Sequence, residues 1–285
     1  MDVFTLYVGQ GALAAVRAGD EAIIVDAHMP ECDDVGPDEI ERSLSDYLRR
    51  NTPRGLLITG LDRDHAHPGG VDLILTKFQP DWVMYPKYYK DTDCATEVFN
   101  VIKRHETRRS ASVRPLARHS MRLDRLDSRE VPGLARNFGF ELFSPHVEDM
   151  DTSNNCSIVV KVTGLDSTGF RYLVTGDTET ARWERISALF GTDLAAEVMA
   201  ASHHGALTGA HAATLLNVQP HTVLISAGCA NQFDHPHPRA VEAYRRVAQH
   251  VYATNAVPGG TCLFTRRIAA GFETRLVRHA QPQPA

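Results

Sequence analysis

The chain has 285 residues, of which 43% are hydrophobic and 23% are charged, and its formal net charge is -5. These values are ordinary for a globular protein. The acidic balance argues against a protein that coats nucleic acid through its overall field, but it does not exclude a local basic groove.

The cysteines and the N-terminal residues favour a cytoplasmic protein. The five cysteines are scattered and form no CxxC pair, which gives no support for a disulfide framework or a thiolate zinc site. Residues 1–4 show no basic region ahead of a long apolar core, and no stretch approaches about 18 uninterrupted apolar residues. We therefore expect no membrane partner.

Alternating short strands and helices are expected along the chain. In the first half, strands are expected at residues 3–8, 12–18, 22–27, 55–59 and 81–85, and helices from Pro37 to near Arg50, through Leu73 to Phe78, and at 92–104. In the second half, strands are expected at 138–144, 157–163, 170–175, 196–201, 221–226, 251–254, 260–266 and 271–278, and helices at 178–190, 208–217 and 238–249. With no internal repeat or linker, the pattern predicts one α/β domain over residues 1–280 and a disordered tail over 281–285.

Residues 103–136 differ in charge from the rest of the chain. They hold ten Lys or Arg residues against four acids. Such a segment could line a path for a polyanionic substrate, or bind nucleic acid or a protein partner. The alternative is a solvated helical surface, which is favoured by the lack of aromatic residues for base stacking between Phe99 and Phe138.

A group of candidate metal ligands follows the expected strand at 55–59. Asp62, Asp64 and His65 come directly after it, and Gly69-Gly70 closes the segment. In an extended or tightly turned segment Asp62 and Asp64 project the same way while His65 points elsewhere, so the three could reach two adjacent metal positions. A mixed set of Asp and His suits Zn, Mn or Fe. The alternative is a solvated turn rich in Asp and His.

Four later strands also end in residues suited to chemistry, and they supply His146, Asp177, the pair His203 and His204, and the pair His235 and His237. Strand ends on one edge of a sandwich converge in space, so five such ends predict a shared site. Each residue also has a structural interpretation. His146 could be a loop residue, Asp177 could cap a helix that begins at Thr178, and His235 and His237 could shape a Pro-rich turn.

An ordered set of motifs covers residues 3 to about 265. The set is Val8-Gly9-Gln10-Gly11, Ile23-Ile24-Val25-Asp26-Ala27, Asp62-x-Asp64-His65 with Gly69-Gly70, Asn154-Asn155-Cys156-Ser157, Thr175-Gly176-Asp177, His203-His204-Gly205 and Gly228 with His235-Pro236-His237-Pro238. In combination it resembles the metallo-β-lactamase superfamily, in particular the branch typified by the C-terminal domain of the competence protein ComEC. The resemblance implies a four-layer αββα sandwich with one or two zinc ions, or manganese, at one edge.

Roles for single residues follow from the same resemblance. It implies that Asp64 and His65 bind one metal together with His203, that Asp177 bridges to a second metal, and that Asp62 and His146 hold this second metal. Asp64 would thereby take part in catalysis. His204, by preference, or else His235 or His237 would donate a proton to the leaving oxygen or hold the scissile phosphate.

The chain departs from the family pattern at two positions. Gly60 stands where the family has a His two residues before Asp62, and Ala12 stands where the family usually has Asp. Because glycine has no side chain, the second metal loses a ligand, which His67 could replace. Two metals with a rearranged ligand set, one metal, or a degenerate site that binds without turnover are the three outcomes.

The function that these observations favour is hydrolysis of a phosphodiester or another small anionic substrate by a metal-activated water, as in a phosphodiesterase or nuclease. One alternative is hydrolysis of a small ester, lactone or β-lactam. The other is a non-catalytic or conditionally active interaction module, whose metal site is weakened at Gly60 and whose basic segment contacts a partner.

Overall fold

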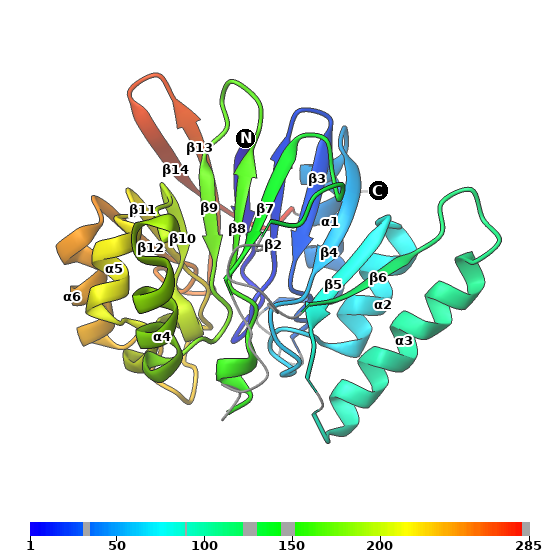
Figure 1. The fold of residues 1–285 in the computed structure, drawn as a ribbon, viewed down its shortest axis with the longest axis horizontal. Coiled ribbons are helices and arrows are strands. Elements are labelled where there is room, and N and C mark those ends of the chain that lie inside the picture. The colour runs from blue at the N-terminus through cyan, green and yellow to red at the C-terminus, as the bar shows by residue number, and fades with distance from the viewer. Residues whose placement is uncertain (31–34, 89, 122–129, 144–151, 281–285) are drawn as a thin grey trace.

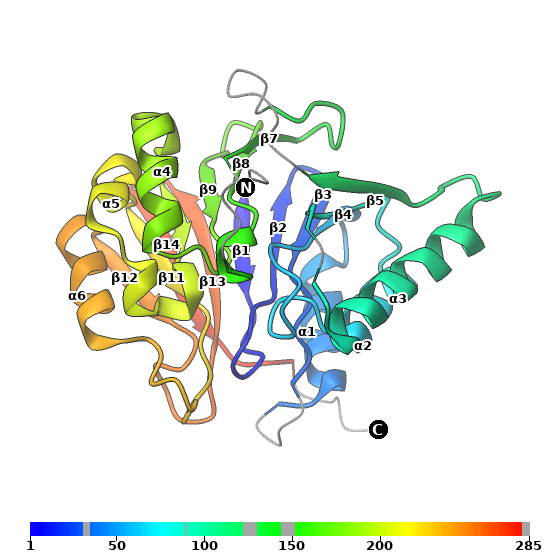
Figure 2. The ribbon, with the colours of Figure 1, turned by 60° about the horizontal axis from the view of Figure 1, so that its bottom comes forward.

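The computed structural model describes residues 1–30, 35–88, 90–121, 130–143 and 152–280. Two β-sheets pack face to face, and helices cover the outer face of each sheet (Figures 1 and 2). This confirms the predicted four-layer αββα sandwich. The expected tail at 281–285 and His146 lie outside the described residues.

The larger sheet has eight strands in the order β14-β13-β1-β2-β3-β4-β5-β6. The strands β3, β4, β5 and β6 run parallel to one another, and the remaining neighbours in this sheet are antiparallel. The bounds are β1 (Asp2–Thr5), β2 (Ala14–Ala18), β3 (Glu21–Val25), β4 (Thr52–Leu57), β5 (Trp82–Pro86), β6 (Ala117–Met121), β13 (Cys262–Ile268) and β14 (Gly271–Val277).

The smaller sheet has six strands in the order β12-β11-β10-β9-β8-β7. Here β9, β10, β11 and β12 are parallel, while β7 and β8 join as antiparallel strands. The bounds are β7 (Phe138–Leu142), β8 (Val160–Gly164), β9 (Arg171–Val174), β10 (Val198–Ala200), β11 (Thr222–Ile225) and β12 (His250–Ala253).

Helices cover the outer side of each sheet (Figure 1). The helices on the larger sheet are α1 (Pro37–Leu48), α2 (Pro68–Lys77) and α3 (Asp93–Arg109), and those on the smaller sheet are α4 (Thr180–Phe190), α5 (Ala212–Val218) and α6 (Pro238–Val247). Helix α1 shows why these segments are helical. Pro37 occupies the first turn, where a missing N–H costs nothing, and Ile40, Leu44 and Leu48 recur on one buried face.

The apolar core has two parts, one on each face of the larger sheet. Along β3 the side chains alternate, so that Ile23 and Val25 lie between the sheets while Ile24 lies under the helices. All three are at most 4% exposed. A strand that is buried on both faces has a continuous run of apolar residues. For this reason the strand β3 could be predicted from the sequence.

Strand β6 was not predicted. It spans Ala117–Met121, pairs in parallel with β5 and closes one edge of the larger sheet. Its residues are Ala-Arg-His-Ser-Met, with exposed and half-exposed side chains. An edge strand that buries little surface does not need apolar residues at alternate positions. The residues of this basic segment therefore gave no indication of a strand.

The parallel strands place their carboxyl ends at one edge of the sandwich. The chain leaves β3 at Asp26, β4 at the turn that contains Asp64 and His65, and β9 at Asp177. A hydrogen bond from Ile158 N to the carbonyl of Thr59, 2.7 Å long, connects the two halves at this edge. Ligand sites of parallel sheets form at such strand ends.

Glu21 joins the two sheets away from this edge. Its side chain is fully buried in β3 and accepts hydrogen bonds from Arg54 Nε at 2.7 Å and from the backbone N–H groups of Arg136 and Asn137, at 2.8 and 2.9 Å, ahead of β7. Burial by itself would raise the pKa of Glu21, but these donors outweigh it and lower the pKa.

We predict that Glu21→Gln lowers the free energy of unfolding by about 2 kcal/mol at neutral pH, because hydrogen bonds to a charged acceptor are lost. Since the folded pKa is depressed, the wild-type contribution is complete above the unfolded carboxyl pKa and is lost as the pH falls through the folded value. The variant should therefore show a shallower loss of stability on acidification in urea titrations. As a control, Asp46→Asn removes an exposed ion pair with Arg49 and should change stability little. Equal pH dependence of wild type and Glu21→Gln would contradict this account.

Candidate metal centre

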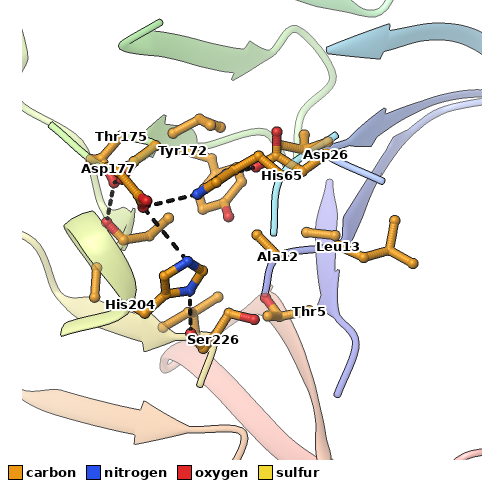
Figure 3. Close-up of a pocket in the computed structure, with 17 residues that line it drawn as sticks. Thr5, Ala12, Leu13, Asp26, His65, Tyr172, Thr175, Asp177, His204 and Ser226 are labelled. Atoms are coloured by element: carbon orange, nitrogen blue, oxygen red, sulfur yellow. Dashed lines mark hydrogen bonds and ion pairs between the residues drawn. The ribbon is translucent and has the colours of Figure 1, made fainter. Parts of the chain in front are cut away.

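Four side chains at the strand ends form a candidate metal site. Asp64, His65, Asp177 and His204 each offer a ligand atom, and these atoms all lie within 4.8 Å of one another. Among the described residues this is the only such group of three or more. In Figure 3, His65 and His204 approach Asp177 from different elements.

The donor atoms lie close together without satisfying one another by hydrogen bonds. His65 Nε2 lies 2.9 Å from Asp177 Oδ1, and His204 Nε2 lies 3.6 Å from the same oxygen. All three atoms are buried, and none has a partner in acceptable hydrogen-bond geometry. Buried polar atoms left in this way are costly. A divalent cation would satisfy them together, and two imidazoles with two carboxylates suit zinc, manganese or iron.

His65 is held in place by a carboxylate behind it. Its Nδ1 lies 2.9 Å from Oδ2 of Asp26, whose carboxylate also accepts hydrogen bonds from the N–H and hydroxyl groups of Thr59. With the Nδ1 proton directed to Asp26, the Nε2 lone pair faces the cluster. This is the carboxylate–histidine arrangement that fixes the tautomer of metal ligands.

His204 reaches the cluster from the turn after β10. Its Nδ1 lies 2.8 Å from the carbonyl oxygen of Ser226, and its Nε2 lies 3.4 Å from Asp64 Oδ2. The backbone has φ of 51° at His203 and 53° at His204, so two successive non-glycine residues are left-handed. Such a conformation costs of order 1 kcal/mol per residue. It turns the two neighbouring rings to different sides.

Asp177 follows β9 directly after Gly176, a position that requires glycine. Gly176 has φ of 52°, and a Cβ at this position would lie 2.7 Å from Cβ of Ser157. The N–H of Asp177 donates to the Ser157 hydroxyl at 2.9 Å. The close approach of these two segments places the carboxylate between His65 and His204.

The charges of the cluster reinforce one another. Burial would lower the pKa of His65, but the carboxylates of Asp177 and Asp26 raise it well above its ordinary value. Burial would raise the pKa of Asp64, but the nearby imidazoles of His204 and His65 hold it well below its usual range. Without a metal the site therefore retains protons on imidazole, which a metal ion must displace.

A small cavity lies at the base of the cluster. It has a volume of about 50 Å³, and its lining includes Asp26, His65, Asp177, His204 and Tyr172 (Figure 3). The Thr5 hydroxyl, which also lines it, is buried with no hydrogen-bond partner. Apolar side chains, among them Leu13, Val25 and Leu224, form much of the remaining lining.

The structure places His203 outside the group of four donors. Its Nδ1 lies 3.5 Å from Glu179 Oε1, and its ring lies 5.6 Å from that of His235. His204 takes its place in the cluster. One ring nitrogen of His204 lies at the Ser226 carbonyl and the other among the donors, and its role as the proton donor stays a prediction.

Other predicted residues lie around the cluster. Asp177 does not cap a helix, because α4 begins at Thr180 with Glu179 as its N-cap. His237 is the N-cap of α6 and accepts a hydrogen bond from Arg239 N, and His67 does the same for α2 through Gly69 N. Both imidazoles thus use Nδ1 to cap a helix, and the roles predicted for them at the site stay predictions. Asp62 forms an ion pair with Lys90 and is not among the four donors.

Sequence reasoning did not assign three residues near the centre. Asp26 ends a strand, so the strand-end rule applied to the later strands would have found it. Tyr88, whose hydroxyl accepts a hydrogen bond from Leu61 N at 3.0 Å, and Lys90 follow β5. Neither stands in a motif, and no pattern in the sequence marks them.

Two competence proteins are similar to part of the chain, whereas no family model matches it. ComE operon protein 3 of Bacillus subtilis is 28% identical over 120 residues, which are 42% of this chain and 15% of that protein. Competence protein ComA of Neisseria gonorrhoeae is 32% identical over 97 residues, which are 34% of this chain and 14% of that protein. The similarity thus spans a small part of the length of either relative.

Two solved structures resemble the whole fold. Igni18, a novel metallo hydrolase from the archaeon Ignicoccus hospitalis, superposes with a TM-score of 0.51 and 14% identity, covering 93% of this chain and 98% of that one. CmlA, a diiron β-hydroxylase from Streptomyces venezuelae, superposes with a TM-score of 0.52 and 14% identity, and the superposition covers 88% of this chain and 52% of that one.

The chain has the metallo-β-lactamase fold. The predicted resemblance to the ComEC-like branch is confirmed by the competence proteins. In this metallo-β-lactamase fold the four donors provide a site for a divalent metal ion. None of the helices in the described ranges has the length and apolar character needed to cross a bilayer.

The two adjacent histidines provide a matched test of the centre. We predict that His204→Ala weakens metal binding by more than about 100-fold. Losing a group that supports a ligand usually weakens the affinity by about 10- to 100-fold, and losing the ligand itself should weaken it more. His203→Ala should leave the affinity unchanged. Calorimetric titration with Zn²⁺ or Mn²⁺ measures both. Weaker binding in His203→Ala with normal binding in His204→Ala would restore the original assignment.

Asp26 is predicted to support metal binding without touching the metal. Asp26→Asn should weaken the affinity by roughly 10- to 100-fold, the usual cost of losing the partner behind a ligating histidine. Asp72→Asn is the matched control, since Asp72 Oδ1 forms the same kind of pair with His105 Nε2 at 2.7 Å, between α2 and α3. An equal loss of affinity in both variants would show that the effect is one of general stability.

Proposed function

We propose that this chain is a metal-dependent hydrolase that cleaves phosphodiester bonds, as a phosphodiesterase or nuclease. The observation that carries the proposal is the convergence of His65 Nε2, His204 Nε2 and Asp177 Oδ1 at a buried point where none of them has a hydrogen-bond partner. A zinc or manganese ion held there would supply a Lewis acid and an activated water.

The centre has one side on which a substrate can approach. His65, Asp177 and His204 are at most 4% exposed, whereas the side chain of Asp64 is 31% exposed. The three buried donors would orient the cation, and Asp64 would hold it at the solvent side. The scissile group would therefore come from the side of Asp64.

His235 supports the substrate-binding part of the proposal. Burial and the nearby imidazoles of His203 and His204 lower its pKa, so it is neutral at physiological pH. A neutral imidazole offers one donor and one acceptor. His235 Nδ1 is buried without a partner, and the ring stacks on Phe233, which is 54% exposed. We assign His235 to hold an oxygen of the scissile group.

Tyr88 is suited to donate a hydrogen bond near the centre. Burial raises the pKa of its hydroxyl, and the charges of Asp62 and Asp177 add to the effect. The phenol therefore keeps its proton at neutral pH. It can donate this proton in a hydrogen bond to a substrate oxygen where negative charge develops.

The phosphodiester class rests on the resemblance to ComEC-like proteins and on the basic segment 103–136. In the described part of that segment several arginines already have acidic partners. Arg104 pairs with Asp72, Arg114 with Asp81, Arg118 with Glu106 and Arg136 with Asp20. This favours the alternative of a solvated surface there, while residues 122–129 lie outside the described ranges. Binding of nucleic acid or a protein partner through the segment stays a prediction.

A second candidate is a non-catalytic or conditionally active interaction module. It is favoured by Gly60, which supplies no ligand, and by Asp62, whose carboxylate is engaged by Lys90. Both weaken the part of the site that would hold a second metal. The four-donor cluster is unaffected, so this candidate would still bind a metal ion.

Hydrolysis of bis(p-nitrophenyl) phosphate by protein loaded with Zn²⁺ or Mn²⁺ tests the proposal. We expect turnover that falls by at least about 100-fold in Asp64→Ala and His204→Ala, because each removes a ligand. Asp72→Asn, distant from the centre, should keep full activity. Turnover of p-nitrophenyl acetate or a lactone, with none of the phosphodiester, would favour the ester or lactone alternative. A metal-loaded protein inactive on all three would favour the interaction module.

A further inference from the structure

Asp62 is the one acidic residue of the turn after β4 that does not join the four donors. Its carboxylate forms an ion pair with Nζ of Lys90, which follows the adjacent parallel strand β5. Only 16% of the Lys90 side chain and 31% of the Asp62 side chain are exposed. The pair is therefore a partly desolvated contact between two strand ends, where charge pairs are stronger than on an open surface.

The ion pair is fixed to the backbone that carries the metal centre. The carbonyl oxygen of Asp62 accepts hydrogen bonds from the N–H groups of His65 at 3.0 Å and Ala66 at 2.8 Å. The hydroxyl of Tyr88 lies where the charges of both Asp62 and Asp177 act on it. Lys90 thus pairs with the residue whose backbone carbonyl holds the turn that carries His65.

Gly60, two residues before Asp62, lies next to the metal centre and supplies no ligand. A Cβ on Gly60 would lie 3.7 Å from Ser157 Oγ and 3.9 Å from Cγ of His65, which is ordinary contact distance. A Cβ there would meet no steric obstacle and would stand next to His65. The backbone at position 60 thus accepts a side chain, and this chain has none.

We propose that the centre holds a single metal ion and that the ammonium group of Lys90 takes the place of a second one. The proposal rests on the metal-dependent function proposed above. Lys90 already neutralises Asp62, and a divalent ion beside it would meet repulsion from the ammonium without an imidazole at position 60 to hold it. An ammonium is a compact cation with three N–H donors. Lys90 is therefore a positioning residue that supplies fixed positive charge through its pair with Asp62.

Metal stoichiometry tests the proposal without reference to activity. The wild type, prepared without chelators and saturated with Zn²⁺, should contain one ion per chain by elemental mass spectrometry and show one binding step in calorimetry. Gly60→His alone should still bind one ion, because Lys90 keeps Asp62 engaged. Gly60→His combined with Lys90→Met should bind two.

Gly60→His combined with Lys77→Met is the matched control. Lys77 forms a pair with Glu41 in which the lysine side chain is 55% exposed, away from the centre. This variant should bind one ion, and Gly60→His with Lys90→Arg, which keeps the charge, should also bind one. Lys90→Gln replaces Lys90→Met if the latter does not fold.

Three results would overturn the inference: two ions in the wild type, two ions in Gly60→His alone, or one ion in both Gly60→His/Lys90→Met and Gly60→His/Lys90→Gln. These results leave the proposed metal-dependent function standing, because metal is still bound. A wild type that binds no ion under the same conditions overturns both proposals.

Discussion

The imidazole of His65, buried between the carboxylates of Asp26 and Asp177, is the contact on which the centre depends. Asp26 comes from the larger sheet and Asp177 from the smaller one, so this contact requires the two sheets to meet at the ends of their parallel strands. Burying charged groups is unfavourable unless they are paired. The arrangement is therefore stable only when the whole sandwich is closed and all of these groups face one another.

The centre is complete on one side and incomplete on the other. Asp64, His65, Asp177 and His204 form a full donor set, whereas the neighbouring positions offer Gly60, without a side chain, and Asp62, held by Lys90. A single complete set is compatible with both functions proposed for this chain. In either of them the set would hold the metal ion, and the missing ligand at Gly60 leaves the four donors unchanged.

The adjacent residues His203 and His204 show how far a motif can be interpreted. The motif correctly indicates that an imidazole from this turn reaches the centre, and it cannot decide which one. That choice depends on two left-handed backbone conformations and on the Ser226 carbonyl, which comes from another strand. In the same way His237 stands in a functional motif, yet its ring caps α6 because the helix begins at the next residue.

The sequence by itself determined the αββα fold class, most of its strands and helices and the participation of Asp64, His65 and Asp177 in one cluster. The strands and helices follow from local patterns, since apolar runs mark buried strands and the polar residues after them lie at the sheet edge. The αββα class follows from the resemblance that the ordered motifs carry. Only the tertiary structure decided that His204 lies among the four donors, that Asp26 contacts His65, that Lys90 engages Asp62 and that β6 pairs with β5. Each of these depends on a contact between segments distant in the chain, and side-chain direction at such contacts is set by backbone turns and packing that no local pattern encodes.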